Sequence, residues 1–217
     1  MTSIAQMPGR APSRRGSAGR EPMPIGAGSI CLDFVATLDG AGEQARDLIA
    51  TPGGLAQWLG LSGLPVPVGG ISALDVAAAG GLRSAIDGVA RAVISGRTPD
   101  SSAIQVINAA VQHPTPVYLM QADGRRRVPI GLADVRASLA VIARDAVHML
   151  TGSDVDRVRE CSREGCGSLF LDRSPSGRRR WCSMKGCGEM VASASYRRRR
   201  AQVTAIPAAR PSIEQGR

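Results

Sequence analysis

Aromatic residues are scarce in this chain, with two Trp, two Tyr and two Phe among 217 residues, or 3%. Because 43% of the residues are nevertheless hydrophobic, the core must consist mainly of Leu, Val, Ile and Ala, which favours packed helices over a β-sandwich. The sequence contains no run of 18 apolar residues, so no transmembrane helix and no membrane partner are predicted. Residues 1–22 lack the apolar segment of a secretory signal.

Histidine and lysine are also rare. His113 and His148 lie in unrelated segments, and no nucleophile has a recognisable base nearby, so the sequence indicates a protein that is not an enzyme. Lys185 is the only lysine, and arginine carries nearly all of the positive charge. Without a secretion signal, we expect a cytoplasmic protein with reduced thiols.

The net charge of +9 is unevenly distributed. Residues 1–22 carry four Arg and one Glu and are predicted to be a disordered basic tail. Residues 23–150 carry nine basic and ten acidic groups, which gives −1, whereas residues 151–217 carry fourteen basic and seven acidic groups, which gives +7. This asymmetry predicts a polyanionic partner for the C-terminal third.

Residues 23–152 are predicted to form a mainly α-helical domain. Apolar residues recur at helical spacing in five stretches, near 30–38, 51–59, 82–96, 99–113 and 132–150. In the first of these a short helix is favoured over a strand. Thr51 and Pro52 form a typical helix start, and the last apolar stripe begins at Leu132.

One β-hairpin is expected within this helical domain. The apolar segment 116–120 and the segment 125–130 flank Asp123-Gly124, which is typical of a two-residue hairpin turn. Pro129 would place the second strand at an edge, because proline cannot donate a ladder hydrogen bond.

Four of the five cysteines follow the pattern C-x4-C-x15-C-x4-C, at Cys161, Cys166, Cys182 and Cys187. The two heptapeptides that contain these cysteine pairs, CSREGCG and CSMKGCG, agree at five of seven positions. Two close pairs of this kind predict a structural site for one zinc ion. The adjacent glycines would allow positive φ where the backbone turns around the metal. Cys31 stands apart and is expected to be a small buried hydrophobic residue.

Other uses of the four cysteines are conceivable. Two disulfides would need an oxidising compartment, for which no secretion signal argues. A C-x4-C redox pair departs from the usual two-residue spacing. An iron–sulfur cluster also takes four thiolates and is the second choice among metals.

The surroundings of the cysteines indicate a treble-clef-like zinc finger at 153–203, built as knuckle, hairpin and helix. Residues 169–171 and 179–181 would be the two strands of its hairpin, with Phe170 and Trp181 covering a core too small to fold without metal. A helix ending in four Arg would follow the second cysteine pair. Residues 204–217 are predicted to be a second disordered tail.

Two arginine runs and the single lysine are the candidate nucleic-acid contacts, because the arginine fork binds phosphate in a bidentate manner. These residues are Arg178, Arg179, Arg180, Lys185, Arg197, Arg198, Arg199 and Arg200. One such run could simply be a solvated helix end that favours the helix dipole. Some arginines could also offset the charge of −2 of a zinc ion with four thiolates.

The segment CGSLFLDRSPSGRRRWCSMKGCG resembles the CGNR-type zinc finger, and SICLDFVATL with DLIATPGGLAQWL is similar to the start of the ABATE domain that usually precedes it. The family is described as bacterial stress-induced transcription regulators. The resemblance implies that the four paired cysteines are zinc ligands, that the finger binds DNA, and that Arg179, Arg180 and Trp181 match the RRW segment. The chain departs from the family pattern at Glu189 and Met190, which stand where CGNR has Asn and Arg. Any DNA contact by that Asn and Arg is therefore missing here, and Glu189 would repel phosphate.

Three functions remain open from the sequence. The first is a zinc-containing, DNA-binding transcription regulator, whose helical domain acts as a sensor or as an oligomerisation module, for example of a homodimer. The second is an RNA- or ribosome-associated zinc protein. The third is a finger whose arginines bind acidic proteins.

Overall fold

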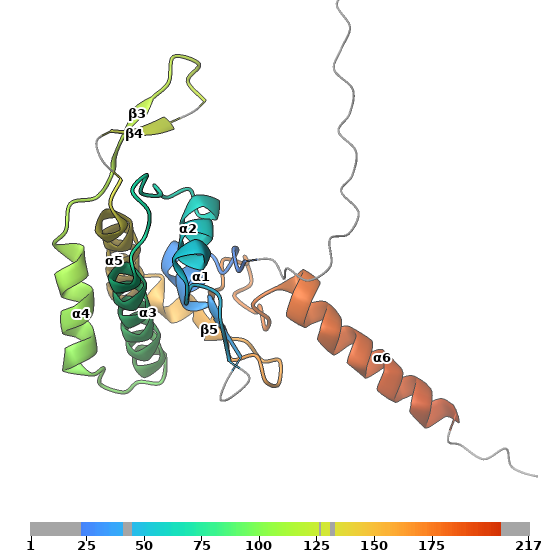
Figure 1. Ribbon diagram of the computed structural model, residues 1–217. Helices are drawn as coiled ribbons and strands as arrows, with labels where there is room; N and C mark the ends of the chain where they lie inside the picture. Colours follow the sequence, from blue (N-terminus) through green and yellow to red (C-terminus); the bar gives the residue numbers. More distant parts are fainter. Residues whose placement is uncertain (1–22, 41–44, 126, 131–132, 205–217) are drawn as a thin grey trace, which may run out of the picture.

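The structure, a computed structural model, describes residues 23–40, 45–125, 127–130 and 133–204 (Figure 1). The two expected tails, apart from Thr204, and Leu132 lie outside the described residues. The helices are α1 (Ile30–Val35), α2 (Pro52–Leu61), α3 (Ala73–Ile94), α4 (Ser101–Val111), α5 (Val135–Thr151) and α6 (Glu189–Thr204). The strands are β1 (Leu38–Asp39), β2 (Arg46–Asp47), β3 (Val117–Met120), β4 (Arg127–Ile130), β5 (Val158–Glu160) and β6 (Leu169–Leu171). A 3₁₀ turn at Val155–Arg157 and a π-helical turn at Met184–Gly188 complete the elements. The expectation of a mainly helical domain with a small C-terminal zinc finger is confirmed.

The helical body is formed by α1 to α5. Helices α3, α4 and α5 pack against one another, α1 packs against α3 and α5, and α2 packs against α3 (Figure 1). Trp58 on α2 and Phe34 on α1 are fully buried, with ring centroids 5.0 Å apart. Most of the remaining core is aliphatic, as the composition predicts.

The helix starts follow from the capping residues. The side chain of Thr51 accepts a hydrogen bond of 3.1 Å from the Gly54 amide, and Pro52 is the first helical residue of α2. Ser72 and Asp75 form a capping box at the start of α3. At the other end of α3, Gly96 follows the capping residue Ser95 and has a φ of +65°, a conformation that glycine adopts readily.

A partly buried ion pair connects α3 to β2. Arg83 is only 5% exposed, and its guanidinium donates two hydrogen bonds of 2.6 Å to the carboxylate of Asp47. It also donates to the Thr37 hydroxyl at 3.1 Å. The hydrogen bond with Arg83 is the main reason that the pKa of Asp47 lies below its usual value, despite an opposing effect of burial.

The predicted hairpin of the body is present, with a longer connection than expected. Strands β3 and β4 pair antiparallel, with Tyr118 opposite Pro129, in a sheet of two strands that stands away from the helices (Figure 1). The prediction of a two-residue turn at Asp123-Gly124 is wrong, because β3 already ends at Met120 and β4 begins at Arg127. Gly124 instead has a φ of +65° within this longer loop, and its amide donates to the Gln121 carbonyl at 2.9 Å.

The hairpin of the finger uses a different partner strand from the one predicted. Strand β6 pairs antiparallel with β5, with Arg159 opposite Phe170, so the hairpin encloses the first cysteine pair. Residues 179–181 are not a strand. Their backbone is held elsewhere: the Arg179 amide donates to the carboxylate of Asp172 at 2.9 Å, and the Arg180 carbonyl accepts from the Ser162 amide at 2.9 Å.

The body and the finger share one continuous core. Val158, Leu169, Phe170 and Leu171 are each at most 2% exposed and belong to the same cluster as the core of the helical body. Strand β6 packs against α1. In contrast, the side chains from Arg197 to Ala201 on α6 are exposed, and α6 projects away from the body (Figure 1).

Candidate metal centre and nucleic-acid interface

The four paired cysteines meet at one point of the structure. Cys161 follows β5 directly, Cys166 ends the turn after it, Cys182 follows Trp181, and Cys187 lies in the π-helical turn before α6. Their sulfur atoms all lie within 4.8 Å of one another. All four are free thiols, so the disulfide alternative has no support in the structure.

The sulfur positions fit a tetrahedral zinc site. The Sγ–Sγ distances are 3.5 Å for Cys182–Cys187, 3.6 Å for Cys166–Cys187 and 3.7 Å for Cys166–Cys182. Zn–S bonds of about 2.3 Å place the sulfurs of a tetrahedron about 3.8 Å apart. These cysteines therefore form the site of one structural zinc ion, as the spacing predicts.

The two similar heptapeptides reach the metal through different backbone conformations. In the first, Gly165 and Gly167 have φ values of +74° and +64°, and the Cys166 amide donates to the Arg163 carbonyl at 3.1 Å. In the second, Gly186 and Gly188 have no positive φ, and the segment forms a π-helical turn closed by the Gly188 amide, which donates to the Ser183 carbonyl at 2.9 Å. The expectation that the glycines play one role in both copies is wrong, because only the first copy uses left-handed glycines.

A cation missed by the sequence reasoning lies beside the sulfurs. Arg163 donates from Nε to the Cys187 sulfur at 3.0 Å, and this hydrogen bond raises the pKa of the guanidinium. Burial raises the pKa of Cys166, but hydrogen bonds with Ser168 and with the neighbouring thiols outweigh it, so the pKa falls to about 6. Burial raises the pKa of Cys182. Four thiolates at this spacing therefore need a cation, which Zn²⁺ supplies and Arg163 supplements.

Arg179, a predicted nucleic-acid contact, points into the finger. Its guanidinium lies 4.8 Å from the ring centre of Phe170, donates to the Trp181 carbonyl at 2.8 Å, and also donates to the Cys182 carbonyl. The buried carboxylate of Asp172 accepts a hydrogen bond from the Arg179 amide. Hydrogen bonds with Ser174 lower the pKa of Asp172. The Asp172 side chain and the Arg179 guanidinium thus fix the segment that leads into Cys182.

The other predicted contacts are on the surface. Arg178, Arg180 and Lys185 are exposed, and the Arg180 guanidinium lies 5.4 Å from the ring centre of Trp181. The four arginines from Arg197 to Arg200 are exposed on α6, which continues beyond them to Thr204 instead of ending there. Because successive helical residues are about 100° apart, these four side chains point to different sides of α6.

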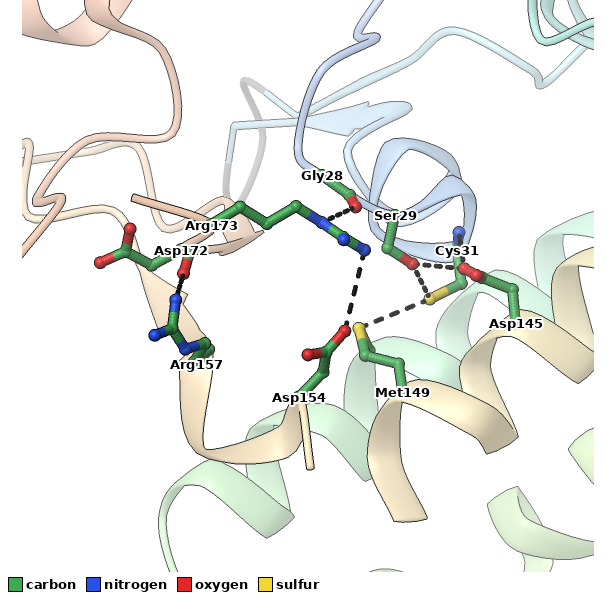
Figure 2. Close-up of polar contacts among 9 residues, drawn as sticks. All are labelled: Gly28, Ser29, Cys31, Asp145, Met149, Asp154, Arg157, Asp172 and Arg173. Atoms are coloured by element: carbon green, nitrogen blue, oxygen red, sulfur yellow. Dashed lines mark hydrogen bonds and ion pairs between the residues drawn. The ribbon is translucent and has the colours of Figure 1, made fainter. Parts of the chain in front are cut away.

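The finger is attached to the helical body by polar contacts that no sequence pattern indicated. On the α1 side, Arg173 donates from Nε to the Gly28 carbonyl at 3.0 Å (Figure 2). The Arg173 guanidinium also lies 3.7 Å from the carboxylate of Asp154, in the segment that leads into the finger. The Leu171 amide donates to the Ala27 carbonyl at 2.7 Å. On the α3 side, Arg91 donates to the Gly167 carbonyl at 2.8 Å and lies 3.2 Å from the carboxylate of Glu160.

Cys31 lies beside this junction and away from the metal site. It is fully buried, as expected, but it also has polar neighbours: its amide donates to Asp145 at 2.9 Å, and its sulfur lies 3.1 Å from the Ser29 hydroxyl (Figure 2). Its sulfur also lies 3.9 Å from that of Met149. These contacts connect the start of α1 to α5.

Two protein-family models match this chain. Residues 28–153 match the ABATE family model, described as "Putative stress-induced transcription regulator", and residues 157–200 match the CGNR zinc finger. A search of curated proteins found no match. Among the described residues, no helix is long and apolar enough to cross a membrane.

Proposed function

We propose that this chain, which belongs to the ABATE family and carries a CGNR zinc finger, is a transcription regulator whose finger binds DNA. The finger would be the DNA-binding element, and the helical body, 23–152, would be a sensor or an oligomerisation module. Neither matched family is described as an enzyme. The zinc-binding thiols suit a reducing compartment such as the cytoplasm.

The observation that carries this proposal is the concentration of exposed cations on the zinc-organised part of the chain. Residues 157–200 carry twelve basic and four acidic groups, a net charge of +8, whereas residues 23–150 carry −1. Of the twelve basic residues, Arg163 and Arg179 are engaged in the finger itself. Arg157, Arg159 and Arg173 also donate to backbone carbonyls. The exposed basic residues that would contact phosphate are Arg178, Arg180, Lys185 and the run on α6.

The positions of the exposed basic residues suggest which of them would contact the DNA backbone and which would contact bases. The arginine run on α6 would hold the DNA backbone, because side chains that point to different sides of one helix cannot all enter a groove. Arg178, Arg180 and Lys185, close to the metal, are the candidates for contacts that depend on sequence. Glu189 is negatively charged and would reduce the attraction to phosphate at the start of α6.

The test is binding-site selection with the zinc-loaded full chain, followed by affinity measurements over a range of salt concentrations. The double change Arg198→Ala/Arg199→Ala should lower the slope of log K against log salt by about 1.8, since each lost phosphate contact removes about 0.9. A matched control, Arg97→Ala/Arg136→Ala, removes two exposed charges from the body and should leave the slope unchanged. Preference for RNA, or binding only to acidic proteins, would replace the DNA proposal with one of the two alternatives.

We further propose that the hairpin β3–β4 is the dimerisation surface. Val117, Leu119, Val128 and Ile130 share one face of the hairpin and are 40–62% exposed. The opposite face carries Tyr118, whose ring stacks with Arg127 at 4.2 Å. An uncharged aliphatic face offers nothing that would repel an identical face across a two-fold axis.

Sedimentation of the wild-type chain and two variants tests the dimer. Leu119→Ser removes a side chain from the aliphatic face and should shift the equilibrium to monomer, whereas Met120→Ser, at the neighbouring position on the opposite face, should not. A wild-type monomer at all concentrations would contradict the dimer without affecting the DNA proposal.

A further inference from the structure

A large cavity lies where the finger meets the start of the helical body. Its volume is about 770 Å³, and its walls come from residues 24–27, the end of α1, Leu48, and the second zinc-binding turn. Cys166, Cys182 and Cys187 also line it. The apolar lining includes Ile25, Ala27, Ala36, Leu48, Met184 and Met190.

The metal site accounts for only a small part of this space. Zinc sits about 2.3 Å from each sulfur, inside the thiol cluster. The apolar residues named above have no part in metal binding, yet they line the cavity. Cavities of roughly 300–1,000 Å³ with mostly apolar walls and a few polar groups are typical of small-molecule sites. The two methionines give this wall an adaptable, polarisable surface.

The charged groups of the lining are mostly cationic. Arg163, Arg173, Arg179 and Lys185 border the cavity, against one carboxylate, Asp33. One oxygen of Asp33 already accepts hydrogen bonds from the amides of Gly26 and Ala27, at 2.8 Å and 2.6 Å.

The cations are not equally available. Arg179 is engaged by backbone carbonyls, and Arg163 by the Cys187 sulfur. Lys185 is exposed and has no hydrogen-bond or ion-pair partner within the part of the chain that the structure describes. Its ammonium group is therefore the cation best placed to receive an anionic group at the edge of an apolar chamber.

We propose that this cavity binds a small amphipathic anion, with its apolar body against Ile25, Leu48 and Met190 and its carboxylate or comparable group at Lys185. Because residues of both the helical body and the finger form the walls, the ligand would bridge the two parts. Occupancy would then change the presentation of the finger to DNA, and only this second step rests on the proposed function.

The test compares decanoate with decanol, which share an alkyl chain and differ in charge, by calorimetry on the zinc-loaded full chain. Decanoate should bind one molecule per chain and about threefold more tightly than decanol. Ala36→Trp should weaken both probes by narrowing the cavity, and Lys185→Gln should weaken decanoate about threefold without changing decanol. Leu119→Ser, on the exposed hairpin, is the control for binding to other apolar surfaces and should bind decanoate like the wild type.

Circular dichroism and zinc content show whether Ala36→Trp is folded. If it folds and binds both probes as tightly as the wild type, or if decanoate and decanol bind alike, the proposal is wrong. If Ala36→Trp does not fold, Leu48→Gln and Met190→Gln, which put polar groups on the apolar wall, must weaken both probes for the proposal to stand. A separate titration of DNA with and without saturating decanoate tests the coupling. If decanoate leaves the DNA affinity unchanged, the regulatory step is wrong but the ligand site stands. If the chain binds decanoate but no DNA, only the proposed function is contradicted.

Discussion

The guanidinium of Arg91, near the C-terminal end of α3, donates a hydrogen bond of 2.8 Å to the carbonyl oxygen of Gly167, the residue directly after a zinc-binding cysteine. The same guanidinium contacts Asp87 on its own helix at 2.9 Å and Glu160 in β5 at 3.2 Å. One side chain therefore links the longest helix of the body to the first zinc-binding turn.

Arg91→Met should weaken this link while keeping much of the apolar volume. We expect the unfolding free energy to fall by about 1–3 kcal/mol, because the Gly167 carbonyl loses its hydrogen-bond donor, and zinc should be released faster to a chelator. Thermal unfolding and chelator kinetics measure both effects. Arg97→Met, just beyond the same helix, is the control; equal behaviour of the two variants would show that the link contributes nothing.

The helical body should fold on its own with reduced stability. A fragment of residues 23–153 keeps its capped helices, but it loses the cover that Leu169, Phe170 and Leu171 give to α1. We expect a helical circular dichroism spectrum and a free energy of unfolding lower by roughly 3–6 kcal/mol, given about 1.5–3 kcal/mol for each large buried side chain. An unfolded fragment would mean that body and finger form a single folding unit.

Arg178 and Arg179 should behave differently although they are neighbours. Arg179→Ala removes hydrogen bonds to the Trp181 and Cys182 carbonyls, so zinc should be lost faster and the finger should melt earlier. Arg178→Ala, on the surface, should leave zinc retention unchanged and weaken DNA binding. The opposite pattern, with normal zinc retention and altered base preference in Arg179→Ala, would identify Arg179 as a reading residue.

The contribution of Asp47 to stability should depend on pH. Because hydrogen bonding to Arg83 lowers the folded-state pKa of Asp47, the stabilisation is present above the ordinary aspartate pKa of about 4 and disappears as the pH falls through the lowered value. At pH 7, Asp47→Asn should cost about 1–3 kcal/mol, less than a fully buried pair because Asp47 is partly exposed. Denaturation of both proteins from pH 7 to pH 3 should show the difference shrinking; zinc loss in acid affects both alike. A difference that stays constant with pH would contradict this assignment.

Restoring the family residues at the start of α6 should strengthen DNA binding. Glu189→Asn/Met190→Arg removes one negative charge and adds a positive one on exposed positions, so affinity and salt dependence should both rise. Glu189→Asn alone separates the loss of repulsion from the gain of a contact. If neither variant changes affinity, these positions face away from DNA.

The sequence predicted the parts of this molecule that depend on local spacing. The zinc ligands were recognisable because each cysteine pair is close in sequence, and the helices because their apolar stripes and caps are local. Strand pairing was harder: 179–181 was the nearest available partner for 169–171, but Asp172 binds the Arg179 amide and β5 takes the place beside β6.

The contacts between distant segments left no trace in the sequence pattern. The direction of the Arg179 side chain is set by Phe170 and two carbonyls that only the folded finger brings together. Arg91 sits on a helix like other surface arginines, and its partner Gly167 is 76 residues away. Such contacts become recognisable only when the topology brings the two segments together.

Cys187 lies two residues before the start of α6, so a zinc ligand is located where the direction of this helix is set. At a rise of 1.5 Å per residue, the arginines at 197–200 lie about 15–20 Å along the helix from Cys187. A change of about 10° in the direction of the helix at the metal would move them by about 3 Å, which is as long as a hydrogen bond. The angular stiffness of the coordination sphere thus sets how accurately the far end of α6 is aimed, and a replacement ion of different preferred geometry should disturb the arginines more than the cysteines that hold it.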